Sequence, residues 1–323
     1  MISRRRVLLA APALAASMYG MRGFAQQPYP TKLIKVVVGN APGGTDDLIS
    51  RFVVKTMQAE FGQTALVENR GGASTTIAGA AVASSPPDGY TLLCLINTGI
   101  VQTVLKEKLP YSLKSFTPIV GVGGFPLALA ASPATKVTNF DEFKALAKSK
   151  DGVTYASGGV GTMAHLNTIR LLKAIDGRGT HVTYKNNPDG LQALAGGFTD
   201  VMLASASEVA SLRSDGKLRV IAVTSDQRAV NLPDVPTMRE LGYPALNPTL
   251  WHGYVAPAGT PPEIVAKLAD VITKAVRDSE FQARFKPLAF QEDIKTGEPL
   301  NKFIADQAAR WHEVIVENNI RVD

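Results

Sequence analysis

Two glycine-rich loops, each placed between a short β-branched run and a longer run with helical spacing, constrain this chain more than any other feature. The first loop is Asn40–Asp46, which follows the apolar run Ile34–Val38. The second is Ser157–Thr162, which follows Val153–Ala156. In open parallel sheets, ligands bind outside the carboxyl ends of the strands, where such loops lie. The two loops therefore predict an α/β fold with a candidate site at each loop.

The remainder of the sequence continues this alternation of short strands and amphipathic helices, with a second α/β block starting near Leu127. We expect further strands at Ala65–Val67, Leu92–Ile96, His181–Tyr184, Val201–Ala204 and Leu218–Thr224. We expect helices at Asp46–Phe61, Gly71–Ser85, Phe140–Ala147, Thr162–Leu172, Ile264–Ala275 and Leu300–Ile315. Thr138 and Asp141 predict a capping box, and Thr260 is the predicted N-cap before Pro261.

The first 25 residues have the composition of a cleaved export signal. Arg4–Arg6 precede the alanine-rich apolar run Val7–Met18, which is too short to span a bilayer. The small residues of Gly23-Phe24-Ala25 predict cleavage before Gln26. The consecutive arginines fit a twin-arginine signal for folded proteins, and an ordinary secretory signal stays open as the alternative. We therefore expect a signal peptide over residues 1–25 and a mature protein in the periplasm.

Length, charge and cysteine content narrow the class of protein. A chain of 323 residues exceeds most single domains, so we expect two. The formal net charge of +6 falls to +2 without the signal, which carries four arginines and no acidic residue. No basic stripe remains, so nucleic acid is not an expected partner. The single cysteine, Cys94, lies in an apolar run, and we interpret it as a buried thiol without a disulfide.

Both glycine loops have the chemistry of a site for a small anion. Glycine lets the backbone approach a bound group, and the helix start that follows offers unpaired N–H donors and a partial positive charge. Ser157 and Thr162 add hydroxyls to the second loop. For each loop the alternative is a tight turn that only caps its helix. One such loop in each half of the chain suggests a ligand held between two domains.

Signals for catalysis or metal binding are weak. No serine lies in a G-x-S-x-G elbow, and the four histidines do not have the spacing of metal ligands. The segment Gly159–Ala164 satisfies the loose dinucleotide pattern, but no acidic residue follows at the required distance. We expect no metal and no cofactor. Trp251 and Tyr254 are interpreted as core or hinge residues.

A set of ordered motifs extends over nearly the whole mature chain. These motifs are Tyr29-Pro30-Thr31-Lys32, Pro42-Gly43-Gly44 with Asp47 and Arg51, Val67-Glu68-Asn69-Arg70-Gly71-Gly72, Pro87-Asp88-Gly89-Tyr90-Thr91-Leu92-Leu93, Leu109-Pro110-Tyr111, Tyr155-Ala156-Ser157 with His165-Leu166, His181-Val182 with Tyr184-Lys185, Leu232-Pro233-Asp234-Val235-Pro236-Thr237 and Ala256-Pro257-Ala258-Gly259-Thr260-Pro261. In these motifs the chain resembles the solute-binding receptors of tripartite tricarboxylate transporters, the Bug-type periplasmic receptors.

The resemblance implies a type II periplasmic binding protein fold, in which two doubly wound α/β domains are joined by a two-segment hinge. Domain 1 would comprise residues 26–127 and 253–323, and domain 2 residues 128–252. The hinge segments would lie near Phe125–Ala128 and Trp251–Val255. The family holds a carboxylate through backbone amides, small hydroxyls and water.

Carried onto this chain, the family's ligand contacts are expected from five loops. The implied ligand-binding residues are Asn40, Ala41, Gly43, Gly44, Asp46, Asn97, Thr98, Ser157, Gly161, Thr162, His165, Tyr184, Asn186 and Ser205. The chain departs from the family where Gly39 and Asn40 replace a proline and an aromatic residue. Thr183 and Asn186 replace a proline and a glycine. Because these positions surround the ligand, they bear on its identity.

The resemblance implies a receptor that captures a small carboxylate and delivers it to the membrane subunits of a transporter. Dicarboxylates, tricarboxylates, aromatic acids and acidic amino acids are all open as ligands. The receptor is expected to be a monomer that contacts the transporter transiently, and not an enzyme. Two alternatives remain: a binding protein that signals to a sensor, and a secreted α/β enzyme.

Overall fold

The computed structural model describes residues 29–321, so the expected signal peptide over residues 1–25 lies outside the described residues. The chain divides into two compact units, residues 1–31 and 32–323. All of the described helices and strands belong to the second unit. Among residues 29–321, no helix combines the length and apolar content that crossing a bilayer requires.

Parallel strands form the first half of a mixed sheet. Strand β1 (Ile34–Val38) pairs in parallel with β2 (Ala65–Asn69) and with β3 (Thr91–Ile96). The antiparallel strand β9 (Thr249–Pro257) then joins β3 to β4 (Phe116–Ala131). Strand β1 is almost wholly buried, as expected of an apolar run in a parallel sheet covered on both faces.

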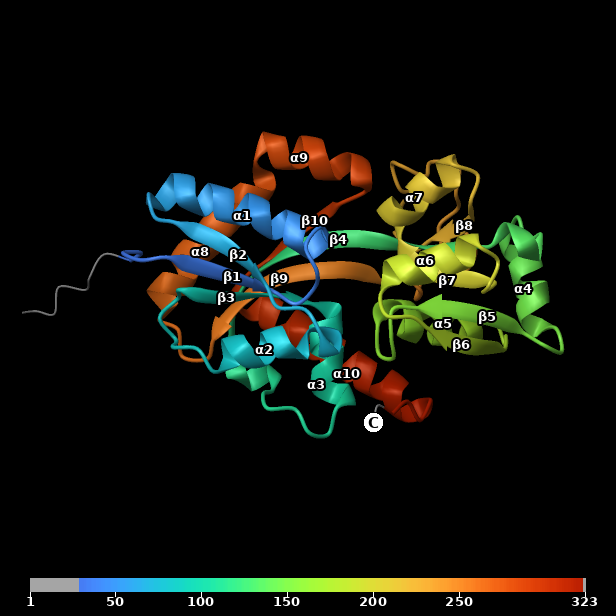
Figure 1. Ribbon diagram of the computed structural model, residues 1–323, viewed down its shortest axis with the longest axis horizontal. Coiled ribbons are helices and arrows are strands. Elements are labelled where there is room, and N and C mark those ends of the chain that lie inside the picture. The colour runs from blue at the N-terminus through green and yellow to red at the C-terminus, as the bar shows by residue number, and fades with distance from the viewer. Residues whose placement is uncertain (1–28, 322–323) are drawn as a thin grey trace, which may run out of the picture. The chain divides into compact units, whose positions relative to one another are not determined.

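Strand β4 continues into the second half of the sheet (Figure 1). Its 16 residues pair with β9 as far as Pro126 and with β7 (Val201–Ser205) from Leu127, so the partner changes near the expected start of the second block, within one long strand. The order is β2-β1-β3-β9-β4-β7-β5-β6. The remaining strands are β5 (Val153–Ser157), β6 (Gly179–Thr183), β8 (Arg219–Val223) and β10 (Gln291–Lys295), of which β8 and β10 also pair with β4.

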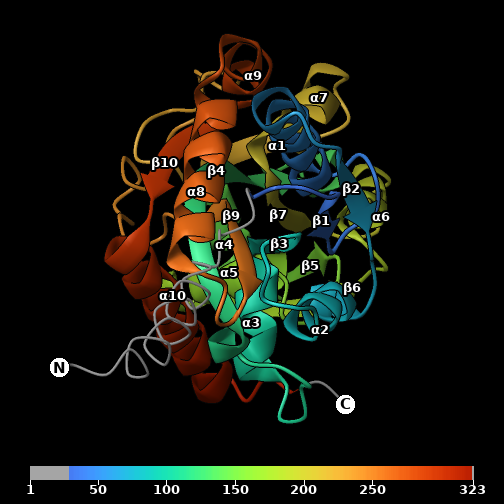
Figure 2. The same cartoon turned by 90° about the vertical axis from the view of Figure 1, so that its left-hand side faces the viewer.

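Helices cover both faces of the sheet. Figures 1 and 2 show α1 on one face of strands β1–β3 and α2 and α3 on the other. The helices are α1 (Thr45–Phe61), α2 (Thr76–Ala83), α3 (Asn97–Leu105), α4 (Phe140–Lys148), α5 (Met163–Ala174), α6 (Asn187–Ala195), α7 (Ala206–Ser214), α8 (Pro262–Arg277), α9 (Ser279–Phe285) and α10 (Gly297–Glu317).

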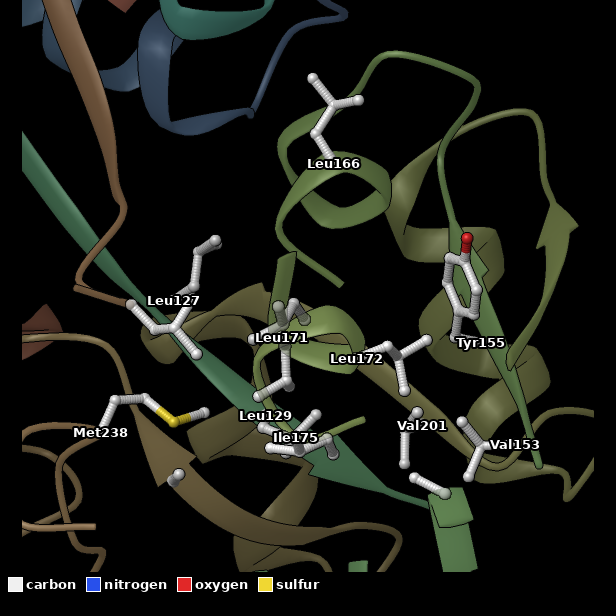
Figure 3. Packing of buried hydrophobic residues seen from close by; sticks show 14 of the residues in the cluster. Leu127, Leu129, Val153, Tyr155, Leu166, Leu171, Leu172, Ile175, Val201 and Met238 are labelled. Atoms are coloured by element: carbon white, nitrogen blue, oxygen red, sulfur yellow. The ribbon is translucent and has the colours of Figure 1, made fainter. Parts of the chain in front are cut away.

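Helix α10 joins two hydrophobic cores. Leu300 and Ile304, in its first half, pack in the core below β1 and β3. Trp311 and Ile315, in its second half, pack in the core around β5, β7 and α5, part of which Figure 3 shows. At about 1.5 Å per residue, its 21 residues extend roughly 30 Å, long enough to reach both cores.

Two predicted caps are wrong in detail. Asn139, and not Thr138, is the N-cap of α4, and its side chain accepts the N–H of Glu142. Thr138 instead bonds to the Glu142 carboxylate through its N–H and its hydroxyl. Thr260 does not cap α8, because its hydroxyl donates to the Pro257 carbonyl. Short polar residues compete for neighbouring backbone groups, so their spacing alone does not select the cap.

Candidate ligand-binding site

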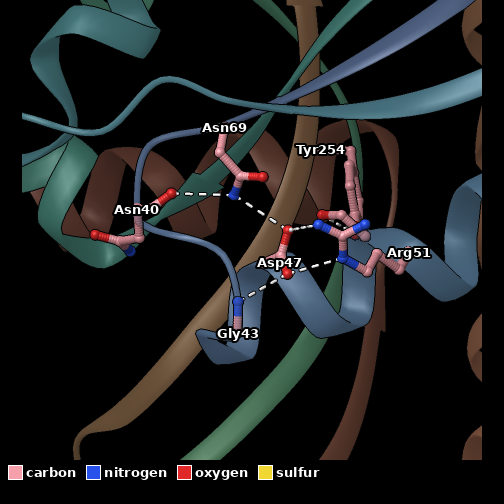
Figure 4. Close-up of polar contacts among 7 residues, drawn as sticks. Asn40, Gly43, Asp47, Arg51, Asn69 and Tyr254 are labelled. Atoms are coloured by element: carbon pink, nitrogen blue, oxygen red, sulfur yellow. Dashed lines mark hydrogen bonds and ion pairs between the residues drawn. The ribbon is translucent and has the colours of Figure 1, made fainter. Parts of the chain in front are cut away.

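The first loop is held in place by Asp47 of helix α1 (Figure 4). Asp47 Oδ2 accepts the N–H of Gly43 at 2.9 Å, and both carboxylate oxygens accept from Arg51, at 2.9 and 3.0 Å. Asn69, at the end of β2, donates to Asp47 Oδ1 and to the carbonyl of Asn40, each at 3.1 Å. The loop is therefore shaped by its own helix and by the neighbouring strand.

The two acidic residues at the start of α1 are both buried, but their pKa values shift in opposite directions. Burial raises the pKa of Asp46, against a hydrogen bond from Asn40 Nδ2 at 2.8 Å. Burial would also raise the pKa of Asp47, but hydrogen bonds from Arg51, Gly43 and Asn69 outweigh it and hold that pKa below its ordinary value. Asp46 is thus shifted toward its neutral form, and the negative charge of Asp47 is compensated by Arg51. The two carboxylates therefore do not cancel the partial positive charge at the N-terminus of α1.

Thr45, the first residue of α1, connects the first loop to strand β9. Its Oγ1 lies 3.2 Å from Nε2 of His252, while His252 Nδ1 has no hydrogen-bond partner within the described chain. Burial lowers the pKa of His252 to about 4, so the ring is neutral near pH 7. The sequence analysis did not single out His252, because its partner is 207 positions away.

The second loop is built around a buried serine. Ser157 is fully buried, and its Oγ lies 2.7 Å from His181 Nε2 and 3.0 Å from the carbonyl oxygen of Gly159. The same Oγ accepts the N–H of Gly159 at 3.2 Å. Asn187 also holds the second loop, because its side-chain Oδ1 accepts the N–H of Gly158 at 3.1 Å. The expected ligand hydroxyl of Ser157 is therefore already engaged in holding the loop.

The start of helix α5 closes the second loop. Thr162 is the N-cap: its Oγ1 accepts the N–H of His165 at 3.4 Å and donates to the Gly159 carbonyl at 2.8 Å. The N–H of Gly161 donates to His165 Nδ1 at 3.1 Å, so Nδ1 carries no proton. His165 therefore positions the loop backbone.

Three rings stack beneath the second loop. The centroids of His165 and His181 are 4.0 Å apart with an interplanar angle of 20°, and the Tyr155 ring is nearly parallel to both, 5.1 Å from His181 and 6.2 Å from His165. Burial, and then the charge of His181, lower the pKa of His165 to about 4, and burial lowers the pKa of His181. The stack is therefore neutral near pH 7, as its close contact requires.

Asn97 and Thr98 start helix α3 at the end of β3. Asn97 is buried, and its Oδ1 accepts the backbone N–H of Trp251 at 2.6 Å, which joins α3 to strand β9. Thr98 is half-buried. The structure thus gives Asn97 a role between two elements, in addition to any contact with a ligand.

Three further predicted residues lie at or just after the ends of other strands in the second half of the sheet. Tyr184 donates its N–H to the Ser157 carbonyl at 2.8 Å, which places it beside the second loop. Asn186 is the exposed N-cap of α6 and accepts the N–H of Asp189. Ser205 is buried in the capping box of α7, and its Oγ lies 2.8 Å from Ser207 Oγ.

Helix α3 connects the two glycine loops. A Cβ added to Gly39, before the first loop, would lie 2.6 Å from Thr75 Cβ, and one added to Gly99 of α3 would lie 3.5 Å from Thr75 Oγ1. A Cβ on Gly161 of the second loop would lie 2.4 Å from Leu105 Cδ2 and 3.1 Å from Gln102 Nε2, both on α3. One helix therefore contacts the second loop directly and the first through Thr75.

The sequence analysis missed two features of this region. Ala73, Ser74 and Thr75 have φ values of 47°, 55° and 72°, a left-handed turn at non-glycine residues that costs of order 1–3 kcal/mol per residue. Gln102 is almost wholly buried, yet both its Oε1 and its Nε2 lack a partner among residues 29–321. The small, apolar composition of Gly71–Ser85 predicted a helix and gave no sign of the strain.

This arrangement favours reversible binding of an anion. Most hydroxyls of the second loop are engaged with its own backbone, so they hold backbone N–H groups in place. Within the part of the chain that the structure describes, no three His, Cys, Asp or Glu side chains are grouped to hold a metal ion. Charged groups near the first loop are paired or buried, which leaves main-chain dipoles as the main polar features.

Comparison with known families agrees with this reading. Residues 49–320 match the family described as tripartite tricarboxylate transporter family receptor. Protein BugT of Bordetella pertussis is 32% identical over 299 residues, which cover 91% of this chain and 91% of BugT.

Two solved structures carry ligands. MatC from Rhodopseudomonas palustris, with bound malate, superimposes with a TM-score of 0.77 at 29% identity, covering 89% of this chain and 100% of MatC. The R. palustris protein Rpa4515, with adipate, superimposes with a TM-score of 0.82 at 26% identity, covering 91% of this chain and 99% of that protein. Both ligands are dicarboxylates.

Proposed function

Because this chain belongs to the receptor family of tripartite tricarboxylate transporters, we propose that it is a periplasmic receptor that captures a small dicarboxylate between its two glycine loops. The fold is that of the two-domain type II periplasmic binding proteins. Relatives of the same fold bind malate and adipate, so a dicarboxylate is the ligand class that we expect first. Delivery to the membrane subunits of a transporter is the second half of the proposal.

One observation carries the proposal: helix α3 contacts the second glycine loop directly and the first through Thr75. Gly161 leaves no room for a side chain against Leu105, and Thr75 separates Gly39 from Gly99. Both loops precede helix starts, where N–H groups and the helix dipole favour a carboxylate. A dicarboxylate has one anionic group for each loop.

We place the domain limits where the sequence analysis expected them, at 127/128 and 252/253. Support comes from the two strands that cross there, because β4 and β9 are paired from Phe116 with Pro257 to Pro126 with Thr249. A two-strand connection of this kind permits a hinge motion that closes on a ligand.

We propose no catalytic role for this site. The Ser157–His181 pair has the residue types of a nucleophile and base, but Ser157 is fully buried and its Oγ also accepts the Gly159 N–H. A nucleophilic hydroxyl has to reach the reacting carbon of a substrate, and this one faces its own loop.

The test is calorimetry with malate, adipate, citrate, benzoate and glutamate, together with mass spectrometry of any small molecule released on denaturation. Stoichiometric binding of one carboxylate, recovered unchanged, is the expected result. Gly44→Val should weaken that binding at least tenfold, because Gly44 is the N-cap residue of α1. Ala258→Val, at an exposed position, serves as the control. Turnover of the bound molecule, or full affinity in Gly44→Val, would refute the proposal.

A further inference from the structure

A cavity of about 310 Å3 lies between strands β4, β9 and β10 and helix α10. We call it the hinge cavity, because Gly123 and Gly124 of β4 and Thr249 and Trp251 of β9 line it beside the expected hinge segments. Among the residues expected to bind the carboxylate, Asn97 alone lines it. Its volume lies at the lower end of the range for small-molecule sites.

Aromatic side chains form much of the wall of the hinge cavity. Trp251 and Trp311 are both buried, and Trp251 lies 5.0 Å from Phe303 at an angle of 44°. Trp251 Nε1 is buried and has no hydrogen-bond partner in the described part of the chain. Flat apolar walls of this kind suit a ring.

The charged residues of the cavity leave one cation uncompensated. Asp293 is paired with Lys295, and Asp306 with Lys302 at 2.9 Å. Arg310 also lines the cavity, and within residues 29–321 it has no carboxylate partner. Arg310 is therefore the lining cation that remains available to a carboxylate, beside two acidic residues that lysines already pair.

A second guanidinium, that of Arg170, contacts one of the aromatic residues of the wall. Arg170 lies over the ring of Trp311, 5.7 Å from its centroid, and donates to Asn167 Oδ1 and to the carbonyl of Ala245. Both of its partners are neutral. Burial, and then the nearby charge of Arg310, lower the pKa of Arg170.

We propose that the hinge cavity is a second binding site, which takes a small monocarboxylate that carries an aromatic ring. The ring would lie against Trp251, Phe303 and Trp311, and Arg310 would bind the carboxylate. This site goes beyond the proposed capture of a dicarboxylate, because it uses other walls and another cation.

Occupancy of the hinge cavity should be coupled to closure of the domains. Its walls include both crossing strands, and α10 packs in both hydrophobic cores. Asn97 links them further, because its Oδ1 binds the N–H of Trp251 and its helix contacts the second loop. A ligand whose affinity differs between the open and closed arrangements shifts the population of the two.

The chain offers a direct probe, because its two tryptophans are Trp251 and Trp311 and both line the cavity. Labelled with 5-fluorotryptophan, the protein should give two 19F resonances, assigned with Trp251→Phe. Titration with benzoate should shift both resonances and saturate. Arg310→Gln should weaken binding roughly tenfold or more, the usual effect of losing a charge-assisted hydrogen bond. Arg239→Gln, which removes an equal charge from an exposed pair with Asp226, should leave the affinity unchanged.

Benzoate is also a candidate for the carboxylate site between the loops, so the titration is repeated in Gly44→Val. Retained saturation there, with loss in Arg310→Gln, supports the hinge cavity. Loss in Gly44→Val with full affinity in Arg310→Gln assigns benzoate to the loops and overturns the inference. Absence of saturable shifts, or equal affinity for uncharged benzyl alcohol, overturns it as well. None of these outcomes depends on whether a dicarboxylate binds between the loops.

Discussion

Replacing Gly161 by alanine tests the contact between the second loop and helix α3. Gly161 has φ of +77°, a region that costs a non-glycine residue about 1 kcal/mol. The new Cβ would lie 2.4 Å from Leu105 Cδ2, and overpacking of that kind costs about 1–3 kcal/mol. Gly161→Ala should therefore lower the free energy of unfolding by about 2–4 kcal/mol, or separate the loop from α3 and weaken ligand binding by a similar free energy.

Gly43→Ala is the matched control, because it changes the first loop in the same way without the clash. Gly43 has φ of +91°, and a Cβ there would meet no atom of the described residues within 4 Å. Its cost should be limited to about 1 kcal/mol of backbone strain. Urea denaturation gives the stability of both variants, and calorimetry with malate gives the affinity.

The difference between the two variants isolates the contact with α3. If both changes have equal effects on stability and on affinity, then α3 does not hold the second loop, and the proposed connection between the loops is wrong. If Gly161→Ala alone loses affinity while the far-ultraviolet circular dichroism is unchanged, the contact is required for binding.

Three further predictions concern buried groups. Gln102→Met should raise the melting temperature of the ligand-free protein, since each buried polar group without a hydrogen-bond partner costs about 1–3 kcal/mol. A lower melting temperature would show that water makes these hydrogen bonds. Burial lowers the pKa of His165 from 6.5 to about 4, so between these pH values the unfolded chain binds a proton that the folded protein does not. Urea titrations should therefore show the free energy of unfolding falling as the pH is lowered from 6.5 toward 4, by roughly 3 kcal/mol at most. His165→Asn should reduce this slope, and an unchanged slope would assign it to other groups such as His252. Burial raises the pKa of Cys94, so Ellman's reagent should react with it at pH 8 only at the rate of unfolding; fast reaction in the folded protein would show that the strand opens.

Local sequence patterns predicted many of the helices and strands. The runs at Ile34–Val38 and Val153–Ala156 form strands β1 and β5, and the glycine loops after them lead into α1 and α5 as expected. These elements follow from hydrophobic periodicity and helix starts, which act over a few residues. The family resemblance is confirmed by the match to residues 49–320.

Long-range pairing decided features that the sequence did not show. The sequence analysis expected a second block near Leu127, and the partner of β4 changes there from β9 to β7, but only the structure shows that Phe116–Ala131 is a single strand. The region Gly71–Ser85 read as one helix, yet it contains the left-handed turn Ala73–Thr75 before α2. Its surroundings, with Gly39 and Gly99 close to Thr75, hold that turn in place.

The sequence by itself determined that the chain is α/β, that two glycine loops precede helices, and that the residues around them suit an anion. The tertiary structure alone decided which groups remain free to act. It places the Ser157 hydroxyl against His181, uses the Asn97 side chain to accept the N–H of Trp251, and leaves the Gln102 amide without a hydrogen-bond partner among residues 29–321. It also brought Trp311 to the cavity that Trp251 lines. The physical reason is that a side chain's remaining hydrogen-bonding capacity depends on neighbours that are distant in sequence, and no local pattern encodes them.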